Sequence, residues 1–391
     1  MSSTPLSWVA AELAGLAESH LLRTRREVTP LPGGRCEIDG RTLIDFSSND
    51  YLGLSLDPRL QAAAIAATEQ YGTGSRASAL VSGRTVCHAL LEEQLARFEH
   101  QQAAVLFPTG YAANLGVIPA LVGPGDVVFC ERLNHASLVD GCRASRARLQ
   151  IFRSDRLDRL RTGLIRAKDA PRRLIVTDGV FSMDGTLAPL RPLCQFAREH
   201  RAMLLVDEAH GTGVHGRNGR GACEAAGCEG DQVTVRIGTL SKAIGSLGGF
   251  AVCSQELADW LWNRCRTQLF STALPPASCA AASRALELIE QEPERRQQLN
   301  TLAKELTGLL TSAGISTTST GGPIIPLIAG SAERAMAISD ALATRGFLAP
   351  AIRPPTVPQG SSRLRISLSA AHSLDDVRQL AAELCDVWKA S

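Results

Sequence analysis

The sequence lacks any run of about 18 apolar residues, which argues against a membrane-spanning helix. It also lacks CxxC pairs: its eleven cysteines are scattered and odd in number, a pattern that predicts reduced, buried thiols in a cytoplasmic protein. An excess of charge of either sign is missing too, because 41 basic and 39 acidic residues leave a net charge of +2. This balance disfavours nucleic acid or an anionic membrane as the main partner.

The residues that are present indicate a globular protein of more than one domain. The chain has 391 residues, of which 45% are hydrophobic and 20% charged. Near the N-terminus, Glu12 and Glu18 interrupt the apolar residues, so we expect an amphipathic helix there and not a signal peptide. A stretch rich in turn formers follows. We therefore predict an arm over 1–48, a large domain over 49–285 and a small C-terminal domain over 286–391.

Alternating apolar segments predict an α/β fold. From residue 126 onward, short β-branched runs alternate with helical patterns, which is typical of βαβ units and a mostly parallel sheet with helices on both faces. Functional side chains in such sheets lie at the carboxyl ends of the strands. We expect strands of the large domain within 126–131, 173–181, 203–211, 232–240 and 248–253. The small domain is expected to be α+β, with strands within 324–330, 345–355 and 363–369.

Lysine is scarce, so each one can be considered separately. Only four of the 41 basic residues are lysines, and three of these lie in polar or helical contexts. Lys242 instead follows a predicted strand, in GTLSKAIGSLGG, where small residues surround it. A lysine in such a pocket can form a Schiff base, which is the chemistry of pyridoxal phosphate enzymes. A solvated loop lysine is the alternative at this point.

The strand expected within 203–211 ends in VDEAHGTG, which has three interpretations. A helicase DEAH box requires a GxxxxGK[ST] phosphate loop, but no lysine in this chain follows a glycine. Gly211, Gly213 and Gly216 spell a dinucleotide-binding GxGxxG, but the residues after them are polar and do not open an apolar helix. In the third interpretation, Asp207 holds the proton on a pyridine nitrogen and His210 bonds the ring hydroxyl.

A metal site is a further alternative in the same segment. His210, His215, Cys223 and Cys228 include the residue types that bind zinc, but their intervals lack the short paired spacing of structural sites. His210 by itself is equally well explained as a hydrogen-bonded core histidine. We therefore predict no metal.

Polar residues after three other segments suit the same cofactor. The stretch PTGYAAN places Thr109, Gly110 and Tyr111 just before a helical pattern, where backbone N–H groups bind an anion well. His135 follows the strand within 126–131, so that it would lie flat against a pyridine ring. Ser182 ends the strand within 173–181, close to the ring oxygens. The ordinary alternatives are a helix N-cap, a lone histidine and a turn residue.

The C-terminal stretch AIRPPTVPQGSSRLRISLSAAH carries a pair of arginines. Its prolines predict a rigid loop, and in the strand that follows Arg363 and Arg365 alternate with apolar residues, which puts both on one face. Two guanidinium groups on one face are suited to bind a carboxylate, which arginine holds bidentately. A solvated strand face is the alternative.

Taken together, these residues resemble the α-oxoamine synthase family of pyridoxal phosphate enzymes. The resemblance extends from Arg23 to the C-terminus and rests on motifs in family order: FSSNDYLGLS, LEEQLARFE, PTGYAAN, LNHASLVDG, TDGVFSMDG, VDEAHGTG, GTLSKAIG and RLRISLSAAH. It implies pyridoxal 5′-phosphate as the cofactor. It also implies the aspartate aminotransferase fold (fold type I), with a mostly parallel sheet in a large domain and a small α+β domain that packs with the arm.

The resemblance also implies roles for individual residues. Lys242 is the Schiff-base lysine, Asp207 pairs with the ring nitrogen, and His135 stacks on the ring and takes part in catalysis. Further cofactor contacts are implied for Gly110, Tyr111, Ser182, His210 and Thr239. Substrate contacts are implied for His135, for Asn49 and Arg365 at the amino-acid carboxylate, and for Arg23 and Thr356.

The activity implied by the resemblance is decarboxylative condensation of an amino acid with an acyl thioester. The C-terminal stretch is most similar to the branch that joins L-alanine to pimeloyl-CoA or pimeloyl-acyl carrier protein in biotin biosynthesis. Glycine C-acetyltransferase and other synthases that use glycine or serine are alternatives within the family. A non-catalytic binding protein of the same fold and a dehydrogenase are alternatives from other classes.

Family members are expected to be homodimers with active sites at the subunit interface. One loop of this chain, GTGSRASALVSG, departs from the family pattern, because Arg76 and Ala79 replace small or basic residues. This loop is expected to reach the cofactor phosphate of the neighbouring subunit.

Overall fold

The computed structural model describes residues 4–391, so the first three residues of the predicted arm lie outside the described residues. The chain divides into two compact units. The larger unit consists of Asp50–Ser182 and Thr186–Gln297. The smaller unit consists of the described residues up to Asn49 together with Met183–Gly185 and Gln298–Ser391.

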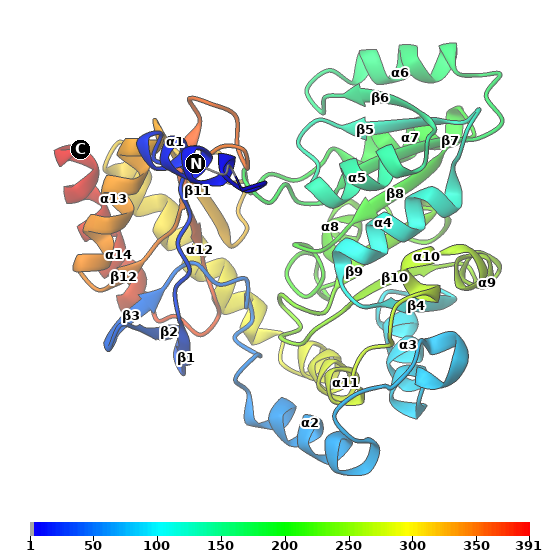
Figure 1. Cartoon of the computed structure of the whole chain (residues 1–391), viewed down its shortest axis with the longest axis horizontal. Coiled ribbons are helices and arrows are strands. Elements are labelled where there is room, and N and C mark those ends of the chain that lie inside the picture. The colour runs from blue at the N-terminus through cyan, green and yellow to red at the C-terminus, as the bar shows by residue number, and fades with distance from the viewer. Residues whose placement is uncertain (1–3) are drawn as a thin grey trace. The chain divides into compact units, whose positions relative to one another are not determined.

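A seven-stranded sheet forms the centre of the larger unit (Figure 1). The strand order is β4-β10-β9-β8-β7-β5-β6, and every neighbouring pair is parallel except those of β10, which is antiparallel to β4 and to β9. The five predicted strands are all present, whereas the edge strands β4 and β6 were not predicted. The strands are β4 (Ala103–Phe107), β5 (Val127–Glu131), β6 (Arg148–Phe152), β7 (Arg173–Asp178), β8 (Met203–Asp207), β9 (Val235–Thr239) and β10 (Gly249–Cys253).

Helices cover both faces of this sheet because its strands are apolar on both sides. On one face, α4, α5 and α9 pack on fully buried residues such as Val176 and Leu205. On the other face, α6, α7 and α8 pack on neighbouring residues such as Ile175 and Val206. The helices are α2 (Pro58–Tyr71), α3 (Val86–Phe98), α4 (Gly110–Leu121), α5 (Ala136–Ala144), α6 (Leu157–Arg166), α7 (Leu190–Glu199), α8 (Gly221–Ala226), α9 (Gln255–Arg264), α10 (Arg266–Leu269) and α11 (Pro276–Gln291), with a π-helical turn η1 (Ala79–Gly83) and a 3₁₀ turn η2 (Gly230–Gln232).

The division between the two units lies later in the chain than the predicted boundary between residues 285 and 286, and helix α11 explains why. Its apolar face, which includes Ala282, Leu286 and Ile289, is buried within the larger unit, so the whole helix belongs to that unit. The division lies within the next helix, α12 (Glu294–Ser312).

Two small sheets form the smaller unit, in the orders β1-β2-β3-β12 and β11-β14-β13. Because β3 pairs in parallel with β12, strands of the arm and of the C-terminal segment share one sheet. The elements are α1 (Trp8–Glu18), β1 (Thr29–Leu31), β2 (Arg35–Ile38), β3 (Arg41–Asp45), β11 (Ile324–Gly330), α13 (Ala332–Thr344), β12 (Phe347–Leu348), β13 (Ala351–Ile352), β14 (Ser362–Ser367) and α14 (Leu374–Ala390).

The predicted N-terminal helix is present as α1, but its apolar side chains are exposed. Trp8 is 62% exposed and Leu13 47% exposed, and α1 contains no buried residue. Within the described part of the chain, no helix combines the length and the apolar character that crossing a membrane requires.

Candidate active site

The carboxyl ends of neighbouring strands bring several predicted residues together in the larger unit. Strand β7 ends at Asp178, β8 at Asp207 and β9 at Thr239, and the first two are direct partners across the β7–β8 pair. All three are buried. Lys242 follows β9 after a tight turn. The polar ends of otherwise apolar strands therefore lie along one edge of the sheet.

His210 links Lys242 to a residue from the start of the larger unit. Its Nε2 lies 2.7 Å from Nζ of Lys242, and its Nδ1 lies 2.7 Å from the hydroxyl oxygen of Tyr51. Tyr51 is fully buried, and His210 is 6% exposed. His210 thus contacts the lysine that the sequence singled out. Its orientation is fixed by Tyr51, to which we assigned no role from the sequence.

Asp207 is held by donors on both carboxylate oxygens. Its Oδ2 accepts a hydrogen bond of 2.6 Å from Nδ2 of Asn114 in α4, and its Oδ1 accepts one of 2.8 Å from the backbone N–H of Ala209. Both side chains are at least 95% buried, since Asp207 is 5% exposed and Asn114 is 1% exposed. The two donors therefore orient both oxygens of this carboxylate.

His135 caps helix α5 and is braced from β7. Its backbone N–H donates to Oδ2 of Asp178 at 2.7 Å, and its Nδ1 accepts from the backbone N–H of Ser137 at 3.3 Å. The residue as a whole is exposed. Desolvation by its surroundings lowers the pKa of His135; the charge of Lys242 lowers it further, and the charge of Asp207 opposes both. His135 is therefore neutral near pH 7.

Asp178 lies beside Asp207, at the end of the neighbouring strand β7. Burial is the main cause that raises the pKa of its carboxyl above the ordinary range, and the neighbouring charge of Asp207 raises it further. The side chain of Asn134 fastens the same loop, because it donates to the carbonyl of Val176 at 2.9 Å and accepts from the N–H of Asp178 at 2.9 Å. The loop that carries His135 is thus pinned to β7 by two side chains.

The predicted anion cradle lies at the N-terminus of α4. The hydroxyl of Thr109 accepts from the N–H of Ala112 at 3.0 Å and caps the helix. A Cβ on Gly110 would lie 3.3 Å from Cβ of Thr239, and a Cβ on Gly249 would overlap the carbonyl of Thr109. Only glycine allows the three segments to approach so closely. Because Thr109 takes the N–H of Ala112, the N–H groups of Gly110 and Tyr111 are those of the first turn that favour an anion.

The other predicted residues of the larger unit differ in their surroundings. Ser182 is 8% exposed, whereas Tyr111 is 44% exposed. The Tyr111 hydroxyl donates to Asp140, and its ring stands edge-on to that of His135, with 6.3 Å between the ring centroids.

Asn49 and Arg365, for which the resemblance implies contacts with the amino-acid carboxylate, contact each other in the smaller unit. Both terminal nitrogens of Arg365 donate to Oδ1 of Asn49 at 3.2 Å, and Nη1 also donates to Ser367 at 2.7 Å. Arg363 lies on the same face of β14 but forms an ion pair of 2.8 Å with Asp184. The two arginines therefore do not act as an equivalent pair, because Arg363 already has a carboxylate partner.

Arg23 and Thr356 lie near one loop of the smaller unit. The Arg23 guanidinium donates to the carbonyl of Pro354 at 3.3 Å, and the N–H of Thr356 donates to the carbonyl of Arg353 at 3.1 Å. Both Arg23 and Thr356 are exposed.

The loop that departs from the family pattern has an unusual backbone. Arg76 has a positive φ of 65°, which a non-glycine residue rarely adopts, and Ala79 begins the π-helical turn η1.

The dinucleotide-binding interpretation of the segment after Asp207 does not fit the structure. The GxGxxG glycines do not join a strand directly to a helix, because α8 begins only at Gly221; Gly213 and Gly216 have φ values of 81° and 85° within a loop. Among residues 4–391, no three His, Cys, Asp or Glu side chains are arranged to hold a metal ion.

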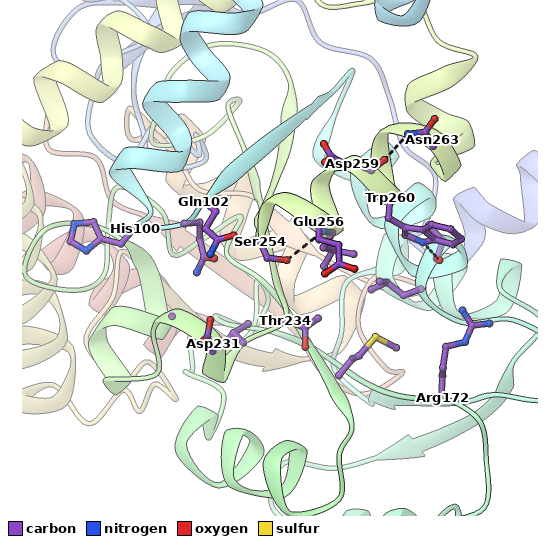
Figure 2. Close-up of a pocket in the computed structure, with 17 residues that line it drawn as sticks. His100, Gln102, Arg172, Asp231, Thr234, Ser254, Glu256, Asp259, Trp260 and Asn263 are labelled. Atoms are coloured by element: carbon purple, nitrogen blue, oxygen red, sulfur yellow. Dashed lines mark hydrogen bonds between the residues drawn. The ribbon is translucent and has the colours of Figure 1, made fainter.

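A pocket of about 1070 Å³ lies at the opposite edge of the same sheet (Figure 2). Arg172 and Thr234, which line it, precede β7 and β9, and Met203 begins β8. Trp260 forms part of its wall and donates to the carbonyl of Ala120 at 2.9 Å. None of the predicted site residues lines this pocket, so its volume does not mark the chemistry predicted from the sequence.

The sequence analysis missed four residues of the candidate site. Tyr51, Asn114, Ser137 and Asp178 all lie within motifs that carried the resemblance. The available signal was their position next to, or a few residues from, a predicted site residue. Their partners are distant in the chain, so only the fold reveals the contacts.

Comparison with known proteins gives the family. Residues 41–384 match the family model described as aminotransferase class I and II. The chain belongs to this family. Synthases named 8-amino-7-oxononanoate synthase are similar over nearly their whole length. That of Anaeromyxobacter dehalogenans is 46% identical over 99% of this chain and 97% of its own, and that of Geobacter sulfurreducens is 46% identical over 97% and 98%.

Solved structures of this family have the same fold. A serine palmitoyltransferase from S. paucimobilis, solved with bound PLP, superposes with a TM-score of 0.94 at 32% identity and covers 99% of both chains. An 8-amino-7-oxononanoate synthase from Francisella tularensis has a TM-score of 0.77 at 28% identity, over 89% of this chain and 98% of its own. The predicted family resemblance and fold class are confirmed.

The residues at the carboxyl edge of the larger unit fit pyridoxal phosphate. Lys242 supplies a primary amine, Asp207 is a buried carboxylate with donors on both oxygens, and Gly110 begins helix α4, where backbone N–H groups favour an anion. The buried Oδ1 of Asn114 has no hydrogen-bond partner among the described residues. Such an unsatisfied atom is typical of a functional site.

Proposed function

We propose that this protein is a pyridoxal phosphate-dependent acyltransferase, an 8-amino-7-oxononanoate synthase of biotin biosynthesis. It condenses L-alanine with pimeloyl-CoA or pimeloyl-acyl carrier protein. A bond forms between Cα of alanine and the acyl carbonyl carbon, the carbon–sulfur bond breaks, and the alanine carboxylate leaves as carbon dioxide. The products are 8-amino-7-oxononanoate, the free thiol and CO₂.

One observation carries this proposal: 46% identity over 99% of the chain with synthases of that name. The fold alone does not select a substrate, since the backbone is also close to serine palmitoyltransferases. Buried Asp207 and His210, together with half-buried Lys242, support the cofactor chemistry, because all three groups have partners that orient them.

The cofactor would be held by residues of the larger unit. When bound, pyridoxal phosphate supplies an electron sink that stabilises a carbanion at Cα of the amino acid. Lys242 would hold it through Nζ, and the N-terminus of α4 with Thr239 would bind its phosphate. Asp207 would pair with the pyridine nitrogen and keep a proton on it. Gly110, Tyr111, Ser182 and His210 would complete the contacts.

Two side chains of the larger unit would take part in the chemistry. One would accept a proton, and the other would stabilise the negative charge that develops on the thioester oxygen. Nζ of Lys242, 2.7 Å from His210, would take the Cα proton of alanine as general base. His135 would stack on the ring and donate a hydrogen bond to the thioester oxygen as negative charge develops there. Its lowered pKa keeps it a neutral donor at pH 7.

The smaller unit would bind the amino-acid carboxylate. Arg365 is almost fully buried, and its guanidinium is held in place by Asn49 and Ser367. A guanidinium that is already oriented loses little entropy on binding a carboxylate. Arg23 and Thr356, both on the exposed part of this unit, would contact the acyl substrate.

Exposed apolar residues support a homodimer, and the free thiols support a location in the cytoplasm. Leu80, Val81 and Phe270 are 55%, 78% and 73% exposed, and the bridge between Ser78 and Thr272 places η1 beside Phe270. An apolar patch of this kind marks an interface. All eleven cysteines are free thiols, as expected in a reducing compartment. Active sites would lie at the subunit interface, and Val81→Asp should give a monomer by analytical ultracentrifugation.

A second candidate is a synthase of the same family with a different pair of substrates. A serine palmitoyltransferase is 32% identical to this chain over 99% of both chains, so L-serine with palmitoyl-CoA is one such pair. Glycine with acetyl-CoA is the corresponding pair for glycine C-acetyltransferase.

The deciding experiment is thiol release by the purified, PLP-loaded protein. We expect release with L-alanine and pimeloyl-CoA, together with 8-amino-7-oxononanoate by mass spectrometry. Glycine with acetyl-CoA and L-serine with palmitoyl-CoA are the controls. Faster release with either control pair would replace the proposed substrates. A protein that binds PLP but releases no thiol from any pair would contradict the acyltransferase assignment.

A further inference from the structure

A continuous chain of hydrogen bonds joins Asp207 to His135 through Asn114 and Ser137. Nδ2 of Asn114 lies 2.6 Å from Oδ2 of Asp207 and 2.9 Å from Oγ of Ser137, and Oγ of Ser137 lies 2.8 Å from Nδ1 of His135. Asn114 and Ser137 are each 1% exposed, so water cannot replace either contact.

The direction of each bond follows from the donors available. A carboxylate only accepts, so Asn114 must present its NH₂ group to Asp207, which settles the orientation of the amide. The same nitrogen has a second hydrogen, which goes to Oγ of Ser137. The Ser137 oxygen therefore accepts from Asn114, and its own hydrogen is left to donate to Nδ1 of His135.

A second contact gives the same answer for the histidine ring. The backbone N–H of Ser137 can only donate, and it points at Nδ1 of His135 at 3.3 Å. Nδ1 is therefore an acceptor from two donors and carries no proton. In the neutral ring, the single proton must then lie on Nε2.

We propose that Asn114 and Ser137 are positioning residues that hold neutral His135 in the tautomer with its proton on Nε2, by a hydrogen-bond chain that starts at Asp207. This inference rests on the proposed function for its catalytic consequence. There, the Nε2–H of His135 is the donor that faces the thioester oxygen. The opposite tautomer would present a lone pair to that oxygen and would repel it.

The hydrogen bonds also couple two roles: that of Asp207 at the cofactor and that of His135 at the thioester oxygen. Asn114 touches Asp207 directly, so its loss affects both the cofactor carboxylate and the histidine. Ser137 touches only the histidine end. Variants of the two residues should therefore differ in which property they change.

The first test is the tautomer itself, in the full-length, PLP-loaded protein labelled with ¹⁵N-histidine. His135 is assigned from the signals lost in His135→Asn. We expect its Nδ1 to resonate as an unprotonated nitrogen and its Nε2 as a protonated one at pH 7.5. A protonated Nδ1 in the wild type would overturn the inference, whatever the enzyme's activity. This measurement needs no positioning variant to fold.

The second test uses three serine variants. In Ser137→Ala we expect mixed His135 tautomers and a fall in kcat of about tenfold, the effect of one buried hydrogen bond, with unchanged PLP affinity. Ser137→Thr keeps the hydroxyl and should restore both signals and rate. Ser145→Ala is the matched control, because Ser145 is a buried serine at the other end of α5 that bonds the carbonyl of Cys142. An unaltered His135 spectrum in Ser137→Ala would refute the role of Ser137.

The third test is Asn114→Ala. Because Asn114 contacts both Asp207 and Ser137, we expect this variant to change the His135 signals and also to weaken PLP binding. Unchanged His135 signals in this variant would break the proposed chain at Asn114. If the tautomer pattern is as expected but the wild type turns over no alanine and pimeloyl-CoA, the positioning chain stands and the proposed substrates fail.

Discussion

The hydroxyl of Tyr51 lies 2.7 Å from Nδ1 of His210, whose other ring nitrogen is 2.7 Å from the amine of Lys242. The two contacts use both nitrogens of one imidazole, so the ring cannot rotate without breaking both. Tyr51 is fully buried and comes from the loop before α2. This tyrosine therefore determines how His210 meets the lysine.

Tyr51→Phe should weaken the cofactor site without unfolding the protein. The change removes one buried hydrogen bond, worth about 1–2 kcal/mol, so we expect PLP to bind about tenfold more weakly. The measurement is PLP affinity by absorbance titration, with thermal unfolding as a check on folding. Tyr71→Phe is the matched control at the end of α2. Equal affinities for the wild type and Tyr51→Phe would show that Tyr51 does not orient His210.

Lys242→Ala should abolish turnover and leave the fold largely intact. Lys242 would hold the cofactor and take the Cα proton, and no other residue near it has a primary amine, because the chain has only three further lysines. We expect thiol release to fall to background, with an unchanged circular dichroism spectrum. Lys304→Ala, in α12 of the smaller unit, is the control. Retained activity in Lys242→Ala would contradict the assignment of Lys242 as the cofactor-binding lysine and general base.

Arg365→Lys and Arg363→Lys should have different effects. Lysine cannot reproduce the two-nitrogen contact of Arg365 with Asn49, so we expect the KM for L-alanine to rise about tenfold with a smaller change in the KM for pimeloyl-CoA. Arg363→Lys can keep the charge pair with Asp184, so its main effect should be on stability. Steady-state kinetics with each substrate varied in turn separate the two. A higher alanine KM in Arg363→Lys alone would reverse the assignment.

Gly211→Ala should destabilise the loop between Asp207 and α8. A Cβ at this position would overlap the buried carboxylate of Glu208, which accepts from the N–H groups of Ala222 and Cys223. We expect a loss of about 2–4 kcal/mol in the free energy of unfolding, as for overpacking that also disturbs a buried charge. Gly308→Ala in α12 is the control, because its Cβ meets nothing within 4 Å and should stabilise the helix slightly. Equal denaturation midpoints for the two variants would contradict this.

His215 should make the protein less stable in acid. Burial lowers its pKa from 6.5 to about 4, and its Nε2 has no hydrogen-bond partner among the described residues. Between pH 6.5 and 4 the unfolded chain binds a proton that the folded chain does not, so stability falls as the pH falls. The loss from this group approaches about 3 kcal/mol at pH 4. His215→Gln should flatten that part of the curve in urea denaturation from pH 7 to 4; an unchanged slope would show that His215 is not responsible.

The sequence by itself determined the α/β class, the family and most of the candidate site residues. Asp207 ends an apolar strand, and His135, His210 and Lys242 each follow the end of one within four residues. Such positions can be read from the order of residues alone. The rarity of lysine made Lys242 stand out. The same local signals identified Thr109 and Gly110 at a helix start.

Only the tertiary structure decided which of these side chains touch and which have other partners. Asn114 and Asp207 are 93 residues apart, and Tyr51 and His210 are 159 apart, so their contacts depend on strand order and on helix placement. Arg363 and Arg365 look equivalent in the sequence, but packing gives Asp184 to the first and Asn49 to the second. Periodicity tells which face of a strand a residue occupies, whereas the partner it meets there is set by segments that are remote in the chain.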